Sequence, residues 1–381
     1  MSETEKIQTI LWQVPKQVIS GPGSMKETAG LVQGTMKHPL VVTGPHLYKA
    51  GLIAPVLESL ERAGIPYTVF HETESDPSIQ TVEKIRNLYE QRACDSLIAA
   101  GGGSVLDAAK AATVLISQGG RLPDFEGSGK VSPLPMTLMA VPATAGTGSE
   151  VTPFAVISDH ERQVKMTVSS PFLIPDLVVL DPDLLANVST GLAAATGMDA
   201  LIHALESFVS RYGDFVSDAF ARRALEKIGG SLVWFVETGD KESAREMMEG
   251  SFLAGCAFSL SRLGLVHAMS HPLSAHYGIP HGVANALLLP EVIRFNEQAA
   301  PQKYREAASL LGVPEGTSLA EWVADLNSRL GIRMKWEISE EDLPVLIRDT
   351  LTLGNVQANP RSASPKDIKT IYNLLISAFK A

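Results

Sequence analysis

The feature that most constrains the fold is a change in the pattern of apolar residues near the middle of the chain. Up to about residue 188, short apolar runs such as residues 39–44 and 96–100 alternate with segments of helical spacing. This alternation of strands and helices predicts βαβ units and a parallel sheet. Beyond that point the segments keep a helical period, with no convincing strand between them. We therefore expect an α/β domain over residues 1–188 and an all-helical domain over residues 189–381.

The individual elements follow from the same patterns. The expected strands are residues 39–44, 65–70, 96–100, 137–141 and 177–180. The expected helices are residues 53–63, 82–92 and 105–116 in the first domain, and 197–210, 217–235, 244–258, 264–276, 283–295, 319–330, 340–351 and 365–379 in the second. Ser364 followed by Pro365 predicts where the last helix begins, because serine caps helices and proline is favoured at their first position.

Charge and composition exclude several kinds of partner. The formal net charge is −10 and no run of five like charges occurs, so we expect no nucleic-acid partner and no anionic membrane surface. Only Cys94 and Cys256 are present, which is no disulfide framework and indicates a reducing compartment. The N-terminus has no secretory signal, and the longest apolar stretch, around residues 136–141, is too short to cross a membrane. We expect a cytoplasmic protein.

The strand predicted at residues 96–100 leads directly into Gly101, Gly102 and Gly103 and then into a helix. Glycines let backbone N–H groups approach a ligand closely, and the helix N-terminus adds a partial positive charge. The turn therefore suits a phosphate or pyrophosphate. Its spacing matches neither Gly-x-Gly-x-x-Gly nor a Walker loop, so a tight turn without a ligand is the alternative.

A second turn, residues 141–150, also follows a predicted strand. Thr144, Thr147 and Ser149 offer hydroxyl groups that could bond a ribose or a nicotinamide amide. The alternative is a polar loop that caps a helix.

Histidines cluster in the helical half. Asp199 and His203 are four residues apart, as are His267 and His271, so each pair shares one face of a helix. His281 stands in a turn that leads into the next helix. The candidate metal ligands are Asp199, His203, His267 and His281. One oxygen and three imidazole nitrogens suit Fe²⁺ or Zn²⁺ better than Mg²⁺ or Ca²⁺, although a single histidine is more often a hydrogen-bonded core residue.

Together these segments resemble the iron-dependent alcohol dehydrogenase family, also called the group III or metal-activated dehydrogenases. The matching segments are residues 100–110, 142–150, 196–206, 267–271 with 281–282, and 359–361. They span nearly the whole chain in the order of the family. The resemblance implies a Rossmann-like dinucleotide-binding α/β domain and an all-α helical domain, the architecture of dehydroquinate synthase, with nucleotide and metal meeting in the cleft between them.

The resemblance also implies roles for single residues. Gly102, Gly103 and Ser104 would hold the pyrophosphate, and Thr144 and Thr147 would contact the nucleoside parts. Asp107 and Lys165 lie at positions that the family uses around the cofactor, and a solvated surface lysine is the alternative for Lys165. The four candidate ligands match the metal ligands of the family. His271 matches a histidine near the reacting carbon.

We therefore expect a metal-dependent NAD(P) oxidoreductase that interconverts a short-chain aldehyde and its primary alcohol. Fe²⁺ is the expected metal, with Zn²⁺ as the alternative, and NAD(H) or NADP(H) carries the hydride. A bound cation stabilises the charge that develops on the aldehyde oxygen, and His271 is a candidate proton donor or relay. Packing beside the site is the alternative for His271. The family implies a homodimer or a higher homo-oligomer.

Three positions depart from the common pattern of the family, and one of them is Pro153, which stands where polar residues often line the substrate cleft. Gly44 stands where many members have an aspartate that excludes the 2′-phosphate of NADPH, so NADPH should be accepted. Arg262, shortly before the helix of His267, could bind an acidic group on the substrate, with Phe258 beside it. A sulfo-, phosphono- or carboxy-aldehyde is the corresponding hypothesis, and an ion pair or a subunit contact is the alternative for Arg262.

Three rival interpretations remain open. One is a polyol- or glycerol-type dehydrogenase acting on a secondary alcohol. Another is a dehydroquinate-synthase-like lyase that uses NAD transiently and would need several basic residues converging on its substrate. The third is an inactive binder of metal or nucleotide.

Overall fold

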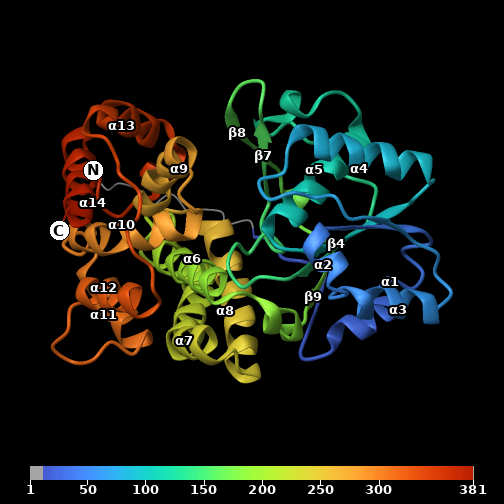
Figure 1. Cartoon of the computed structure of the whole chain (residues 1–381), viewed down its shortest axis with the longest axis horizontal. Helices are drawn as coiled ribbons and strands as arrows, with labels where there is room; N and C mark the ends of the chain where they lie inside the picture. Colours follow the sequence, from blue (N-terminus) through green and yellow to red (C-terminus); the bar gives the residue numbers. More distant parts are fainter. Residues whose placement is uncertain (1–11, 381) are drawn as a thin grey trace, which may run out of the picture.

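A computed structural model describes residues 12–380, and the side chains of residues 12–377. It consists of a sheet-containing half, blue to green in Figure 1, and a helical half, yellow to red. The sheet of the first half has six parallel strands in the order β1-β9-β6-β4-β2-β3. These strands are β1 (Gln17–Ser20), β2 (Pro39–Thr43), β3 (Thr68–Phe70), β4 (Ser96–Gly101), β6 (Leu138–Pro142) and β9 (Leu177–Leu180). The five strands predicted from the sequence are confirmed, and β1 is an additional edge strand.

Both faces of this sheet are buried, because successive side chains point to opposite sides. Leu40 and Val42 of β2 belong to one apolar cluster, and Val41 belongs to the other. The helices of this half are α1 (Thr28–Val32), α2 (Pro45–Lys49), α3 (Ala54–Arg62), α4 (Ile79–Gln91) and α5 (Gly103–Gln118). Short 3₁₀ helices lie at η1 (Ser24–Glu27), η2 (Leu122–Phe125), η3 (Pro171–Leu173) and η4 (Pro182–Asn187).

The strand order reverses at β2 and β4, and the turns that follow the central strands meet there. In the register of the sheet, Thr43 of β2 lies beside Ala100 of β4, and Gly101 lies beside Pro142 of β6. Gly44, the triple-glycine turn and the second turn therefore follow neighbouring carboxyl ends of the sheet. Open α/β sheets bind ligands at such a switch point.

A small second sheet was not predicted. It contains β5 (Gly127–Ser128), β7 (Phe154–Asp159) and β8 (Val164–Ser169), with β7 and β8 antiparallel. Its strands are short and mix polar with apolar residues, so they carry a weak strand signal. Strands β7 and β8 follow the second glycine-containing turn along the chain, whereas β5 precedes it.

The second half is helical throughout. Its helices are α6 (Thr190–Val209), α7 (Phe215–Thr238), α8 (Lys241–Ser261), α9 (Leu265–Tyr277), α10 (His281–Asn296), α11 (Pro301–Leu310), α12 (Leu319–Arg329), α13 (Leu343–Thr352) and α14 (Pro365–Lys380), with 3₁₀ helices η5 (Glu340–Asp342) and η6 (Gly354–Ala358). Only α11, which is mostly polar, was not predicted. The Ser364 hydroxyl accepts the N–H of Asp367, as expected for a helix cap. The domain boundary at residue 188 stays a prediction: β9 ends at Leu180 and α6 begins at Thr190.

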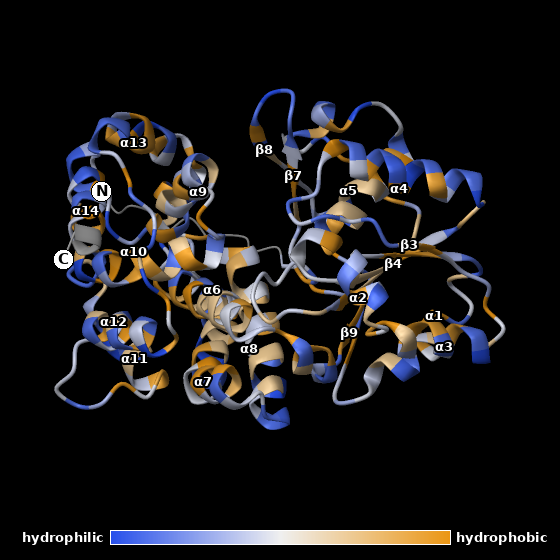
Figure 2. Cartoon of the chain, viewed as in Figure 1, coloured by the Kyte–Doolittle hydropathy of each residue, from blue (hydrophilic) through white to orange (hydrophobic). Residues whose placement is uncertain are grey.

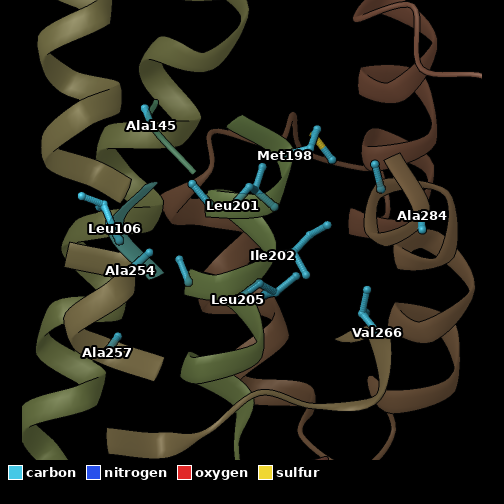
Figure 3. Close-up of a cluster of buried hydrophobic side chains, with 14 of the residues drawn as sticks. Leu106, Ala145, Met198, Leu201, Ile202, Leu205, Ala254, Ala257, Val266 and Ala284 are labelled. Carbon is cyan, nitrogen blue, oxygen red and sulfur yellow. The ribbon is translucent and has the colours of Figure 1, made fainter. Parts of the chain in front are cut away.

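Helix α6 is the centre of the helical half and packs against α7, α8 and α10. By length and composition it could cross a membrane, but 89% of its apolar window is buried inside the protein. Figure 2 shows apolar residues gathered on the strands and on the helix faces around α6. Figure 3 shows Leu106 of α5 and Ala145 of the second turn near α6 and Ala254 of α8, so apolar contact joins the two halves. Both cysteines are free and buried.

Close packing of α10 against α6 depends on Gly282. A Cβ atom at this position would overlap the carbonyl oxygen of Ala195 in α6. A glycine at residue 282 therefore lets the first turn of α10 lie directly on the α6 backbone.

We predict that Gly282→Ala destabilises the protein by about 2 kcal/mol, because the added methyl group must push α10 away from α6. Gly191→Ala, also in a helical first turn, is the matched control: a Cβ there meets no atom within 4 Å, so this variant should be neutral or slightly stabilising. Chemical denaturation of both variants measures the difference. Equal stabilities would show that the close approach at Gly282 is unimportant.

Candidate metal and cofactor site

Three helices carry the four predicted metal ligands to one place. Asp199 and His203 lie one turn apart on α6, and both are buried. His267 lies in the first turn of α9, and His281 is the first residue of α10. The spacing of four residues on α6 aims both side chains the same way.

The donor atoms of the four side chains converge. The Asp199 Oδ1 atom lies 3.8 Å from His203 Nε2, 3.5 Å from His267 Nε2 and 3.8 Å from His281 Nε2. The rings of His203 and His267 stack at a centroid distance of 4.7 Å, and those of His267 and His281 lie 5.3 Å apart. Ligands about 2.1 Å from one tetrahedral cation are themselves about 3.4 Å apart, which is close to the separations of Asp199 from the three imidazoles. The group whose donor atoms all lie within 4.8 Å of one another comprises Asp199, His203 and His267 and does not include His281.

Outer hydrogen bonds fix which imidazole nitrogen faces the cluster. His203 Nδ1 donates to the carbonyl oxygen of Gly146 at 3.1 Å, because a carbonyl can only accept. His267 Nδ1 lies 2.7 Å from Glu206 Oε2. In both rings Nε2 is then the nitrogen that faces the cluster, and such outer partners raise the basicity of a ligating imidazole.

Glu206 is itself held in place at the N-terminus of α9. Its two oxygens accept the backbone N–H groups of Gly264, at 2.9 Å, and Val266, at 2.7 Å. The side chain of Glu206 thus binds the start of α9 and orients His267 at the same time.

The pKa shifts reflect the density of titratable groups. Burial works against ionisation of Asp199, but the surrounding histidines outweigh it and hold the pKa of this carboxyl well below its usual range. Burial lowers the pKa of His203 to about 4. Burial also lowers the pKa of His267, but hydrogen bonds to Asp199 and Glu206 outweigh it and raise this pKa to about 9. Burial lowers the pKa of His281 well below its ordinary value.

This donor set fits a divalent transition metal. Donor atoms of Asp199, His203 and His267 all lie within 4.8 Å of one another, and His281 adds a third imidazole. One carboxylate and three imidazoles are ligands that iron(II) and zinc accept, whereas Mg²⁺ and Ca²⁺ require mainly oxygen. The carboxamide of Asn285 also reaches the cluster, with its Nδ2 atom 2.7 Å from Asp199 Oδ1.

The triple-glycine turn is packed against the second turn. Gly102 is the N-cap of α5, so the free N–H groups of that helix lie at this turn. A Cβ atom on Gly103 would lie 2.8 Å from the Thr147 side chain, and one on Gly102 would lie 3.6 Å from Thr144. The two turns therefore form one surface.

Ser104 and Asp107 make contacts within the protein. The Ser104 hydroxyl accepts the N–H of Asp76 at 3.3 Å. Asp107 accepts the Ser149 hydroxyl at 2.5 Å and the N–H of Val156 at 3.0 Å. Asp107 thereby anchors the end of the second turn, and its predicted contact with a cofactor stays a prediction.

Gly44 and Lys165 have different surroundings. Gly44 caps α2 with extended backbone, and a Cβ there would meet the carbonyl oxygen of Thr73 at an ordinary 3.4 Å. Lys165, on β8, forms an exposed ion pair with Asp76 at 2.5 Å. The charge of Lys165 also contributes to lowering the pKa of His271.

His271 lies beside the metal cluster, with its ring 5.2 Å from that of His281. The protein around the ring lowers its pKa to about 4 through desolvation, with smaller contributions from His267 and Lys165. At neutral pH the imidazole is neutral. Its predicted role as a proton donor or relay stays a prediction.

The two predicted substrate residues are in different surroundings. The Phe258 ring stacks on His203 at 4.4 Å, so it forms a wall of the cluster. The guanidinium of Arg262 lies over the ring of Tyr212, 5.1 Å from its centroid, and contacts none of the four ligands in the described part of the chain. Arg262 has a φ of 63°, which only glycine adopts readily, so the chain is strained just before α9.

The sequence analysis did not single out Glu206 or Asn285 as site residues. Glu206 follows His203 by three residues and Asn285 follows His281 by four, so each shares a helix face with a ligand. That spacing is the signal that could have found them.

Comparison with known proteins agrees with this site. Residues 15–182 match the family described as iron-containing alcohol dehydrogenase, and residues 193–376 match the C-terminal part of the Fe-containing alcohol dehydrogenase family. The NAD-dependent methanol dehydrogenase of Bacillus methanolicus is 35% identical over 371 residues, which cover 94% of this chain and 97% of the relative.

Two solved structures extend the likeness to three dimensions. A 1,3-propanediol oxidoreductase has a TM-score of 0.91 at 33% identity, covering 97% of this chain and 100% of that one. A sulfoacetaldehyde reductase from Bifidobacterium kashiwanohense, in complex with NAD⁺, has a TM-score of 0.89 at 28% identity, covering 97% and 99%. Both halves of the chain and the ligand cluster thus lead to one conclusion: this protein belongs to the iron-containing alcohol dehydrogenase family, an oxidoreductase family that uses iron and NAD(H).

Proposed function

We propose that this chain interconverts a short-chain aldehyde and its primary alcohol where the two halves meet, with aldehyde reduction as the physiological direction. The observation that carries the proposal is the hydrogen bond from His203 to Gly146. It joins a candidate metal ligand to the turn whose threonines would contact the nucleotide. Cation and dinucleotide would therefore lie side by side, as hydride transfer to a polarised carbonyl requires.

The cation supplies Lewis acidity toward the aldehyde oxygen, and the reduced nicotinamide supplies the hydride. The chain positions both. Asp199 and the three imidazoles would hold the cation, and Glu206 keeps His267 in the tautomer that this needs. Phe258 covers one side of His203, and the neutral ring of His271 would pass a proton between solvent and the product oxygen.

We further propose that NADPH is accepted alongside NADH. Gly44 follows β2 at the switch point of the sheet, where a carboxylate would repel a 2′-phosphate. The glycine brings no charge there. Its Cβ direction is open enough for a larger residue, because the nearest atom, the Thr73 carbonyl oxygen, would lie 3.4 Å away.

An acidic aldehyde is the finer substrate proposal. Arg262 and Lys165 are cations on opposite halves, one preceding α9 and the other on β8. Either could pair with a sulfonate, phosphonate or carboxylate. The structural relative named sulfoacetaldehyde reductase supports this class of substrate.

A polyol-type dehydrogenase acting on a secondary alcohol is the second candidate, and a dehydroquinate-synthase-like lyase is a third. The family matches favour a dehydrogenase over a lyase. Net consumption of NADH or NADPH with an aldehyde separates the lyase from both dehydrogenases. Oligomeric state and cytoplasmic location stay predictions.

The metal centre is tested by His203→Ala, with His276→Ala as the matched control. We expect His203→Ala to lose bound iron or zinc and to lower kcat/KM for aldehyde reduction on the order of a thousandfold, since several kcal/mol of charge stabilisation depend on the cation. His276 pairs with Asp349 at 2.8 Å, outside the cluster. The His276→Ala variant should therefore keep both its bound metal and its kcat/KM for aldehyde reduction. Elemental analysis and kinetics give the readouts, and full activity of metal-free protein would refute the proposal.

The cofactor proposal is tested by Gly44→Asp. We expect the variant to lower kcat/KM for NADPH at least tenfold while that for NADH changes little, because the new carboxylate repels only the 2′-phosphate. Steady-state kinetics with both cofactors measure this. A wild-type protein that already rejects NADPH by more than a hundredfold would contradict the proposal.

The acidic-substrate proposal is tested by Arg262→Ala and Lys165→Ala, with sulfoacetaldehyde and propionaldehyde as substrates. If one of these side chains binds the sulfonate, its replacement by alanine should raise KM for sulfoacetaldehyde about tenfold or more. The KM for propionaldehyde should stay unchanged. Equal effects on the two aldehydes, or none, would reject that residue as an anion-binding group.

A further inference from the structure

Asn285 brings an uncharged hydrogen-bond donor into the middle of the ligand cluster. It lies on α10 one turn after His281 and is fully buried. Its Nδ2 atom is 2.7 Å from Asp199 Oδ1, 3.1 Å from His267 Nε2 and 3.1 Å from His281 Nε2. Three of the four candidate ligands therefore share one amide group.

The two ends of this carboxamide have unequal surroundings. When both imidazoles are neutral, the NH₂ end has two hydrogens and three acceptors around it, so at most two contacts are fully satisfied at once. The Oδ1 end is buried without a hydrogen-bond partner. Exchanging the two ends would place Oδ1 against the Asp199 carboxylate, which repels it, so the NH₂ group must face the ligands.

The hydrogen bonds to imidazole and the binding of a cation exclude each other. A neutral imidazole nitrogen has one lone pair in its plane, which either accepts an N–H or binds a metal. A carboxylate oxygen has more than one lone pair, so Asp199 can accept the Asn285 hydrogen bond and bind a cation at the same time. Contacts of Asn285 to His267 and His281 cannot.

We propose that Asn285 is a positioning residue that competes with the cation for the imidazole lone pairs and thereby weakens metal binding and speeds metal exchange. The inference rests on the proposed metal-dependent function. In metal-stripped protein the amide holds Asp199 and an imidazole together. When the cation binds, Asn285 keeps Asp199 and gives up the imidazole.

The test compares Asn285→Val with Asn327→Val in the full-length chain. Asn327, on α12, is also a buried asparagine: its Nδ2 donates to the carbonyl oxygen of Ala286 at 2.6 Å and its Oδ1 has no partner, but it contacts no ligand. Each protein is stripped with a chelator, and Zn²⁺ binding is measured by competition with a chromophoric chelator. Thermal unfolding is followed for the stripped and loaded forms.

We expect Asn285→Val to bind Zn²⁺ about five- to tenfold more tightly than wild type, because one hydrogen bond no longer has to be broken on loading. Its Tm should fall more in the stripped form than in the loaded form. Asn327→Val should leave the Zn²⁺ affinity unchanged. A merely structural role for Asn285 would instead leave Zn²⁺ affinity unchanged or weaken it.

Asn285→Asp is the second variant, which keeps the shape and replaces the NH₂ group by an oxygen. The extra carboxylate oxygen should tighten Zn²⁺ binding further and raise the affinity for Mn²⁺ relative to Zn²⁺, since oxygen ligands favour Mn²⁺. Asn285→Ala, which removes the amide and adds no ligand, decides the question if Asn285→Val fails to fold: tighter Zn²⁺ binding than wild type supports the proposal, and equal or weaker binding overturns it.

The outcomes separate the two proposals. If wild type binds neither Zn²⁺ nor anaerobic Fe²⁺, the proposed metal-dependent function falls and this inference falls with it. If wild type binds Zn²⁺ and neither Asn285→Val nor Asn285→Ala binds it more tightly, only the inference is overturned.

Discussion

The hydrogen bond between His203 Nδ1 and the Gly146 carbonyl oxygen is the contact on which the site depends. It joins a residue of α6 to the turn after β6. The two halves of the chain are thus joined where the candidate metal ligands meet the turn proposed to contact the nucleotide. The close approach that it needs is possible because residue 146 is glycine: a Cβ there would lie 2.7 Å from the Cβ of Thr196. One hydrogen bond therefore orients an imidazole and sets the distance between the nucleotide turn and the metal cluster.

The same turn is fixed from the other side by α5 and α8. Asp107 accepts the Ser149 hydroxyl, and the buried ammonium of Lys110 donates to Ser149 and to the Thr152 carbonyl. A Cβ on Gly148 would lie 2.8 Å from Gly255 of α8, so the turn and α8 touch backbone to backbone. Such a densely packed junction has little freedom, which suits a reaction that needs cofactor and cation held at one separation.

Much of this arrangement could be predicted from the sequence, because helical and strand periods are local properties. The spacing of Asp199 with His203 predicts two ligands on one helix face, and the glycines after residue 100 predict a turn at a helix N-terminus. The contacts that complete the site are not local. Glu206 binds the start of α9 from nearly sixty residues away in the sequence, and Asn285 on α10 donates a hydrogen bond to Asp199 on the neighbouring helix α6. The surroundings of Arg262 also depend on tertiary packing, which places Tyr212 beneath its guanidinium.

The outer partners give the two stacked imidazoles different chemistry. His203 faces a neutral carbonyl, and burial lowers its pKa to about 4, so its lone pair is available across the physiological range. His267 faces the Glu206 carboxylate, and its hydrogen bonds to Asp199 and Glu206 raise its pKa to about 9. A more basic imidazole is a stronger metal donor, but a proton then competes with the cation for the same nitrogen. Glu206 thus makes His267 both the ligand that benefits most from its outer partner and the one at which acid first opposes metal binding.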